Sequence, residues 1–342
     1  MFHPSTYGSS EDYGFRHPVT KIRARKSILK RRKHLTASEG LPESFRYNPE
    51  QLTPARNQGR CGSCWAFAIT SSVADRIRIK GGPSVLLSPQ HLLNCIYPSC
   101  EGADIDEALS LLPKSGFVPE IEIPYQQLDG GPVIQKCNKN LDGYHVNIEN
   151  YKTYVIDGSG EDLIRNMKAH IYHDGPIIGA MLEVYPDINN YDGVSIYEPR
   201  PNQTSEGGHA IEIIGWGKNE NNIPYWICRN SWGPYWPSNH LPGGGVGWFY
   251  VKMGVNASHI EEVAYACLPT PVETNDAVST DQSDEYPGEV SRDKYINPPY
   301  YPPLILNSDD NSSSNAEVLA TLLIILIGIY IIYRLTSKSS NN

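Results

Sequence analysis

Apolar residues between Cys64 and Lys80 recur at a helical spacing. They occupy positions 65, 69, 73 and 77, and Gly81, Gly82 and Pro83 end the run. The pattern predicts a helix that begins at Cys64. Unpaired N–H groups and the positive dipole end of a helix N-terminus favour an anion, so they favour the thiolate of Cys64 over the thiol. Because the thiolate is the nucleophilic form, Cys64 is a candidate catalytic residue.

Two further segments carry helix signals. Ser88 can cap a helix that has Pro89 at its first position and runs to Cys95. Residues 161–172 combine a helical apolar period with acids in the first turn, and residues 174–176 supply a stop. We therefore expect helices at both places.

The second half of the sequence has a different pattern. Between residues 146 and 267 short runs rich in β-branched and aromatic residues alternate, as at 207–217 and 247–252. Such runs predict strands. A helix-rich first part followed by a strand-rich second part indicates an α+β fold.

The N-terminal segment, residues 1–40, is polar and basic. Eight Lys and Arg and no acid lie between Lys21 and Lys33, although the 342-residue chain has a net charge of −9. A segment without a sustained apolar period cannot fold alone, so we interpret it as the short prosegment of a zymogen. It contains no cysteine. For residues 30–33 three interpretations stay open, namely a solvated tail, a processing site and an anion-binding arm.

The C-terminal region changes character twice. Residues 269–315 are rich in Pro, Ser and Asp, which is typical of a linker. Residues 318–333 form sixteen uncharged and mostly apolar positions, slightly fewer than the ~20 of a bilayer crossing. With no core nearby to join, this run predicts a single transmembrane helix at 316–335, followed by a short tail at 336–342. Basic residues after the run and acids before it predict a cytoplasmic C-terminus.

The compartment is inferred from two conflicting signals. Seven cysteines are consistent with three pairs and one free thiol, which favours an oxidising compartment. The first residues are polar instead of forming an apolar signal segment, which by itself favours the cytosol. We give the cysteines more weight and expect the folded part on the lumenal or extracellular side of a membrane, in a lysosome-like compartment or a virus particle. Asn202, Asn256 and Asn311 are then expected glycosylation sites.

Three motifs follow one another in a specific order. The first is Gln58 followed by Cys61-Gly62-Ser63-Cys64-Trp65, the second is Gly208-His209-Ala210, and the third is Asn230-Ser231-Trp232-Gly233. Cys64 precedes His209 by 145 residues. In residues and order the chain resembles the papain family of cysteine peptidases, and within it most nearly cathepsins X and B. The resemblance implies a papain-like peptidase domain at 41–268, with a helical lobe at about 41–145 and a β-rich lobe at 146–268.

The resemblance also implies the roles of the motif residues. Cys64 is the nucleophile, His209 the general base and Asn230 the residue that orients the imidazole. Gln58 and the backbone N–H of Cys64 form the oxyanion hole, and Trp232 covers the His–Asn hydrogen bond. No metal or cofactor is expected.

Further residues take roles from the same resemblance. The implied disulfides are Cys61–Cys100 and Cys95–Cys137, whereas the pairing of Cys228 and Cys267 is left open. The residues implied to contact substrate are Gly102, Ala103, Glu261 and Glu262, of which Ala103 stands where relatives have a second glycine.

Whether the enzyme cuts interior or terminal bonds is predicted from two segments that block one end of the cleft in relatives and are missing here. Only Gly59 and Arg60 separate Gln58 from Cys61, and residues 101–136 contain no histidine. Cathepsins X and B use an insertion or a His-bearing loop at these places to act as exopeptidases. We therefore expect a monomeric endopeptidase that acts on protein or peptide substrates. The alternative is a carboxypeptidase like cathepsin X, with His240 as the residue that could bind a terminal carboxylate.

Two other classes of function remain as alternatives. One is a catalytically silent adhesion or structural protein, which the intact set of catalytic residues disfavours. The other is an anion- or nucleic-acid-binding protein acting through residues 21–33. That stretch lacks interleaved aromatic residues, so no nucleic-acid partner is expected.

Overall fold

The computed structural model describes residues 29–34, 40–138, 152–237 and 247–268. The predicted linker and anchor, most of the N-terminal segment and His240 lie outside these residues. None of the helices in the described stretches combines the length and the apolar surface that a bilayer crossing requires. Contacts divide the chain into a unit from Met1 to Tyr300 and a second from Tyr301 to Asn342. The second unit lies wholly outside the described residues.

Helix α1 spans Cys64–Ile79 and begins at the predicted residue. Helix α2 spans Pro89–Cys95, and the Ser88 hydroxyl accepts a hydrogen bond from the His91 backbone N–H at 3.0 Å. Helix α4 spans Gly160–Asp174, slightly longer at both ends than the predicted 161–172. Local spacing and capping residues were therefore sufficient to place these three helices.

Helix α3, Ile105–Ser115, was missed by the sequence analysis. Its signals are present: the Asp104 carboxylate accepts a hydrogen bond from the Glu107 N–H at 3.1 Å, and Gly116 ends the helix at φ 69°. A cap residue, acids in the first turn and a terminal glycine could have located it.

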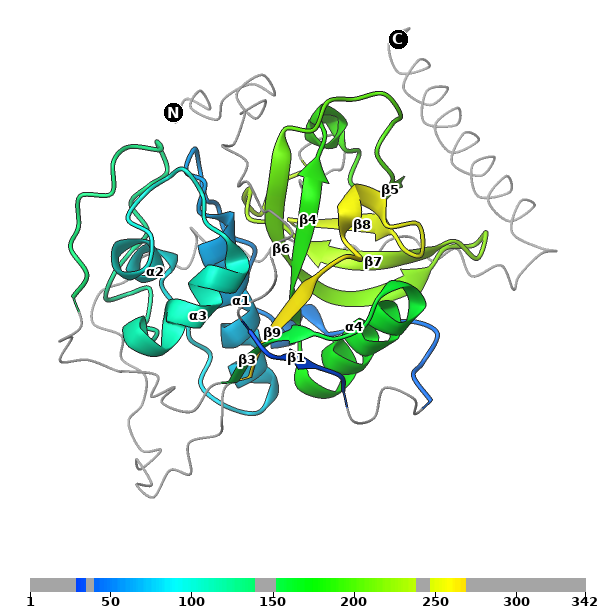
Figure 1. Cartoon of the computed structure of the whole chain (residues 1–342), viewed down its shortest axis with the longest axis horizontal. Coiled ribbons are helices and arrows are strands. Elements are labelled where there is room, and N and C mark those ends of the chain that lie inside the picture. The colour runs from blue at the N-terminus through cyan, green and yellow to red at the C-terminus, as the bar shows by residue number, and fades with distance from the viewer. Residues whose placement is uncertain (1–28, 35–39, 139–151, 238–246, 269–342) are drawn as a thin grey trace, which may run out of the picture. The chain divides into compact units, whose positions relative to one another are not determined.

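The strands form one mixed sheet. They are β1 (Arg31–Arg32), β2 (Phe45–Arg46), β3 (Lys152–Ile156), β4 (Ile177–Val184), β5 (Ile196–Tyr197), β6 (Gly207–Lys218), β7 (Pro224–Arg229), β8 (Trp248–Lys252) and β9 (Ala264–Leu268). The order is β1-β3-β9-β4-β6-β7-β8-β5, and β2 pairs with β6. Short 3₁₀ helices lie at Pro49–Gln51, Pro186–Asn190 and Ala257–His259. The fold is thus α+β (Figure 1).

Alternating side chains of the shared strands belong to two different cores. Ile177 and Ile211 pack with α4 and the β6–β8 strands, whereas Ile178 and Ala210 pack with helices α1 to α3. Neighbouring residues of a strand point to opposite faces of the sheet. One set of strands therefore supplies a wall of both the helical core and the β-rich core.

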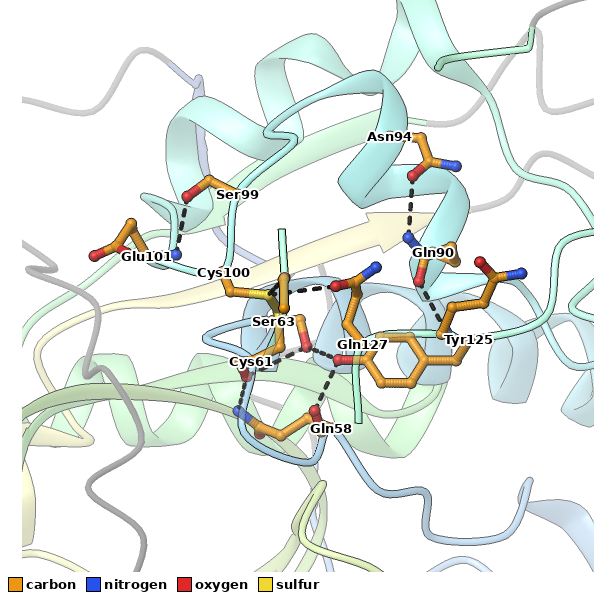
Figure 2. Close-up of a disulfide and its surroundings, with 12 residues drawn as sticks. Gln58, Cys61, Ser63, Gln90, Asn94, Ser99, Cys100, Glu101, Tyr125 and Gln127 are labelled. Atoms are coloured by element: carbon orange, nitrogen blue, oxygen red, sulfur yellow. Dashed lines mark hydrogen bonds between the residues drawn. A yellow bond between two sulfur atoms is a disulfide. The ribbon is translucent and has the colours of Figure 1, made fainter. Parts of the chain in front are cut away.

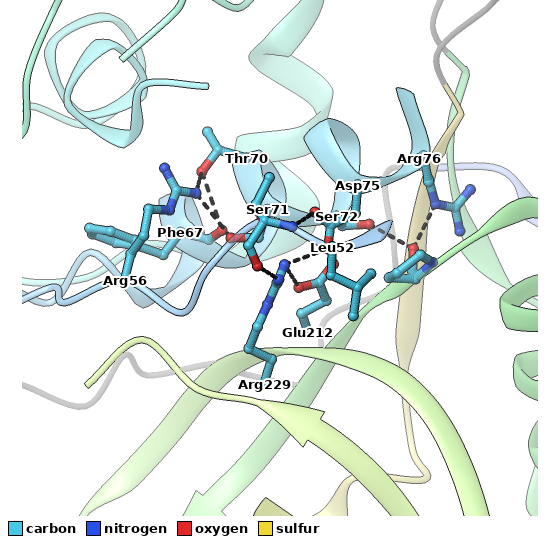
Figure 3. A network of polar contacts seen from close by, with 12 residues as sticks. Leu52, Arg56, Phe67, Thr70, Ser71, Ser72, Asp75, Arg76, Glu212 and Arg229 are labelled. Carbon is cyan, nitrogen blue, oxygen red and sulfur yellow. Dashed lines mark hydrogen bonds and ion pairs between the residues drawn. The ribbon is translucent and has the colours of Figure 1, made fainter. Parts of the chain in front are cut away.

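A buried polar network joins α1 to the sheet between these cores (Figure 3). The Arg229 guanidinium donates to the Asp75 carboxylate at 2.6 Å, to the Glu212 carboxylate and to the Thr53 carbonyl. Asp75 also accepts a hydrogen bond from the Thr53 N–H at 2.6 Å. Burial raises the pKa of Glu212 to about 8, because two carboxylates share one guanidinium away from water. The network is close to neutral when Glu212 keeps its proton.

The described part of the N-terminal segment extends the sheet. Arg31 and Arg32 pair in parallel with Val155 and Ile156 of β3. The Val155 N–H donates to the Lys30 carbonyl at 3.0 Å, and the Asp157 N–H donates to the Arg32 carbonyl at 2.8 Å. Residues 30–32 thus occupy the edge that β3 would otherwise expose. The sequence analysis had no local signal for this pairing, because it depends on residues more than a hundred positions away.

Candidate active site

Cys64 opens helix α1 and is held there by the loop before it. The disulfide Cys61–Cys100 fastens this loop (Figure 2). The Gly62 N–H also donates to the Cys100 carbonyl at 2.8 Å. A second disulfide joins Cys95 to Cys137. These are the two pairs that the family resemblance implies. The Cys61–Cys100 disulfide holds the turn that precedes α1, and it thereby helps to position the Cys64 thiol at the start of the helix.

Gln58 links this loop to the motif around Asn230. Its buried amide donates one N–H to the Cys61 carbonyl at 2.9 Å and accepts a hydrogen bond from the Ser231 hydroxyl at 2.6 Å. Its backbone N–H donates to the Ser231 carbonyl at 2.8 Å. A primary amide carries two N–H groups. The second N–H of Gln58 is the group suited to donate to an oxyanion beside Cys64.

His209 lies on β6, and its ring is oriented by two neighbours. Its Nε2 is 2.8 Å from the Asn230 Oδ1 atom, which also accepts the Ser231 N–H at 2.8 Å. Because this oxygen is an acceptor for both contacts, Nε2 carries a proton. The Trp232 ring stacks on the imidazole with 5.0 Å between centroids. Asn230 therefore engages Nε2 and leaves Nδ1 as the ring nitrogen suited to proton transfer.

Tyr125 is a supporting residue that the sequence analysis missed. Its hydroxyl donates to the Gln58 carbonyl at 2.7 Å and lies 2.6 Å from the Ser63 hydroxyl (Figure 2). Burial raises its pKa, so the hydroxyl stays protonated. It connects the oxyanion-hole residue to the residue preceding Cys64. Nothing in the local sequence indicates this role, because both contacts cross more than sixty residues of chain.

The remaining thiols correct an expectation from the cysteine count. Three pairs were expected, but the structure has two disulfides and three cysteines outside them, namely Cys64, Cys228 and Cys267. Cys228 lies on β7 and Cys267 on β9, three strand positions apart in the sheet. That separation is roughly 14 Å, well beyond the reach of a disulfide.

Burial also makes the thiols of Cys228 and Cys267 less reactive than a catalytic thiol has to be. It raises the pKa of Cys267 to about 12 and raises that of Cys228 well above its usual value. Both thiols are therefore protonated and inert at neutral pH. They fill core positions on the strands.

The residues expected to contact substrate lie in two places. Gly102, at φ 92°, follows the disulfide loop, and Ala103 is buried against the helical core. Glu261 is buried, and its oxygens accept hydrogen bonds from the Trp226 indole and from the N–H groups of Gly254 and Asn256. These contacts give Glu261 a structural role in its turn.

Glu262 has a different environment. Its side chain is about 40% exposed and pairs with His259, three residues before it. Of the two adjacent acids, Glu262 is thus the one available to a ligand.

Comparison with known proteins agrees with this geometry. The family model described as papain family cysteine protease matches residues 41–268. Cathepsin B-like CP2 of Giardia intestinalis is 32% identical over 242 residues, which cover 68% of this chain and 75% of that protein. Cathepsin Z of Onchocerca volvulus is 36% identical over 198 residues, which cover 56% of this chain and 61% of that protein.

A solved structure supports the fold. Procathepsin B S9 from Trypanosoma congolense aligns with a TM-score of 0.62 at 24% identity, over 77% of this chain and 89% of that one. The family model covers more than half of the chain, with Cys64 at the start of α1, His209 on β6 and Asn230 directly after β7. The chain belongs to the papain family of cysteine proteases.

Proposed function

We propose that this protease is an endopeptidase that cuts protein or peptide substrates through an acyl-enzyme intermediate. The observation that carries the mechanism is the Asn230 contact to Nε2 of His209, because it directs Nδ1 to the reaction. The Cys64 thiolate attacks the substrate carbonyl, and the His209 imidazolium gives its proton to the leaving amine. His209 then takes a proton from water, whose oxygen attacks the thioester carbonyl and expels the Cys64 thiolate, so the thiolate and the His209 imidazolium are both restored.

The developing oxyanion needs donors that are already in place. Gln58 is positioned from both sides, by Cys61 in its own loop and by Ser231 in the third motif. Its amide therefore does not have to reorganise during the reaction, which is the property that makes such a donor effective.

The short turn after Gln58 supports cleavage at interior bonds. Gly59 has φ 59°, and a Cβ atom there would lie 2.2 Å from the Leu128 carbonyl oxygen. The Arg60 N–H donates to that same carbonyl at 2.8 Å. The turn is thus packed directly against residues 127–130. An added blocking segment between Gln58 and Cys61 would have to displace this contact.

The test compares two internally quenched peptides that differ only at the C-terminus. One carries an amide and the other a free carboxylate. Cleavage of both at the same interior bond is the expected result. Strict dependence on the free carboxylate, lost in the His240→Ala variant, would instead establish a carboxypeptidase. Cys64→Ser protein serves as the blank for both peptides.

We further propose that a C-terminal segment at 316–335 anchors the protease, with the catalytic domain on the lumenal or extracellular side. The hydropathy of that segment and the two disulfides support the proposal.

Glycosylation offers a test of this location, and the two described sequons differ in accessibility. Asn202 is exposed, whereas the Asn256 amide donates to Glu262 at 3.3 Å and accepts from the Glu261 N–H at 3.0 Å. Ser258 of the second sequon is buried. Glycan on Asn202 in protein from native membranes is therefore the expected result. Fully reduced protein without glycan on any sequon would place the domain on the cytosolic side.

A further inference from the structure

A second group of polar side chains lies away from the catalytic residues, where the N-terminal segment meets α4. The Asp174 Oδ2 atom is 3.0 Å from Nδ1 of His170 and 3.4 Å from Nε2 of His34. One ligand-type atom from each residue lies within 4.8 Å of those of the other two. His170 is buried, and His34 and Asp174 are partly buried. None of these residues takes part in the peptidase mechanism.

The fold brings the three residues together from two separate segments. His170 and Asp174 are one turn apart in α4 and therefore share a face of the helix. His34 follows β1 and is positioned by its backbone N–H, which donates to the Asn166 Oδ1 atom at 3.2 Å. Its ring stacks on that of His173, with 4.8 Å between centroids. The adjacent Lys33 ammonium pairs with Asp162 at 2.8 Å.

The protonation states suit a cation. Burial lowers the pKa of both His34 and His170, so the two imidazoles are neutral at neutral pH. Two neutral imidazoles and one carboxylate are the ligating forms of these groups.

The distances are those of a small tetrahedral ion. Zn²⁺ binds nitrogen and oxygen ligands at about 2.0–2.2 Å, so neighbouring ligand atoms in a tetrahedral site lie roughly 3.3–3.5 Å apart. The two contacts to Asp174, at 3.0 and 3.4 Å, are close to that value, and all the ligand-type atoms lie within 4.8 Å of one another. We propose that His34, His170 and Asp174 form a Zn²⁺ site, with water in the fourth position, that fastens the N-terminal segment to α4.

Arg76 sets an upper limit on the affinity. Its guanidinium donates to the carbonyl groups of Gly175 and Pro176 at 3.1 and 2.6 Å, immediately after Asp174. This fixed positive charge weakens cation binding relative to an isolated set of two histidines and one aspartate. The site is therefore expected to respond to changes in zinc concentration instead of holding the ion permanently.

The first experiment measures zinc binding to the full chain carrying Cys64→Ser, which removes the catalytic thiol as a competing ligand and prevents self-cleavage. Titration against a chromophoric zinc chelator should give one equivalent. His34→Ala and Asp174→Asn should each weaken binding at least ~10-fold. His259→Ala is the matched control, since His259 also lies beside two carboxylates, Glu183 and Glu262, but outside the cluster. It should bind as the parent does.

The second readout is the attachment of the segment itself. Zinc should slow trypsin cleavage after residues 30–33 in the parent protein, and it should have no effect on that cleavage in His34→Ala. Equal zinc affinity in the parent and His34→Ala would overturn the site. So would cleavage that depends on pH but not on zinc, because the cluster would then be a proton-sensitive contact without a metal.

Discussion

Helix α1 packs against strand β6 at two places, one with the candidate catalytic residues and one with a buried ionic network. At one end lie Cys64 and His209, the proposed nucleophile and general base, and at the other Asp75 and Glu212 belong to the buried network around Arg229. Burial does not distinguish the two places. Cys64 and His209 are 3% and 4% exposed, and Asp75 and Glu212 are 0% and 1% exposed.

The difference lies in the partners. Asp75 and Glu212 share the Arg229 cation, and burial raises the pKa of Glu212, so the network stays close to neutral. His209 has a neutral amide, Asn230, on one ring nitrogen, which orients the ring without placing a charge beside it. The same degree of burial therefore supports catalysis at one end, where a proton can move, and structural stability at the other.

The largest effect is expected at the catalytic end. Cys64→Ser should lower kcat/KM by about 10⁴-fold or more, because a hydroxyl is far less acidic than a thiol. The near-isosteric change should leave Tm unchanged, which calorimetry can check. Activity within tenfold of the wild type would refute the assignment of Cys64 as nucleophile.

A change in the buried network around Arg229 should lower the stability of the fold. Arg229→Met leaves the buried Asp75 carboxylate without its cation and Glu212 without its hydrogen-bond donor. The unfolding free energy should therefore fall by about 3–5 kcal/mol in denaturant titrations. Arg78→Met is the matched control, because Arg78 lies on α1, three residues after Asp75, but is only partly buried and contacts the Leu52 carbonyl at 3.3 Å. Equal losses in the two variants would remove the distinction drawn for Arg229.

The oxyanion donor should show a smaller kinetic effect than the nucleophile. Gln58→Ala should lower kcat by ~10²–10³-fold with little change in KM, since the lost contact forms in the transition state. Gln127→Ala, a nearby buried glutamine beside Cys100, should retain kcat. A similar loss in both variants would point to disruption of the loop, and Tm measurements on each would reveal it.

The smallest expected effect is a change in pH dependence. Burial raises the pKa of folded Glu212 to about 8, above its ordinary value of 4.5. Its contribution to stability is therefore complete below that ordinary value and is lost as pH rises through about 8. Glu212→Gln imitates the protonated acid, so between about pH 5 and 8 its Tm should fall less than that of the wild type, by a few degrees. Parallel Tm–pH curves would contradict this assignment.

Much of the catalytic site follows from local sequence. The apolar spacing after Cys64 placed the start of α1, and the three motifs indicated Gln58, His209 and Asn230 as its partners. Ser88 with Pro89 placed α2 in the same way. Each of these signals depends on a few consecutive residues, because helix caps and apolar periods act within one or two turns.

Only the tertiary structure decided which distant groups meet. The sheet order separates Cys228 from Cys267, brings Arg229 to Asp75, and gives β3 the partner strand that carries His34 towards α4. The Tyr125 hydroxyl likewise contacts Gln58 and Ser63, and no residue near Tyr125 in the sequence predicts these contacts. These contacts depend on strand order and on the packing of two cores against one sheet. The sequence pattern gives the period of each helix or strand, but it does not specify which other elements will pair with it or pack against it.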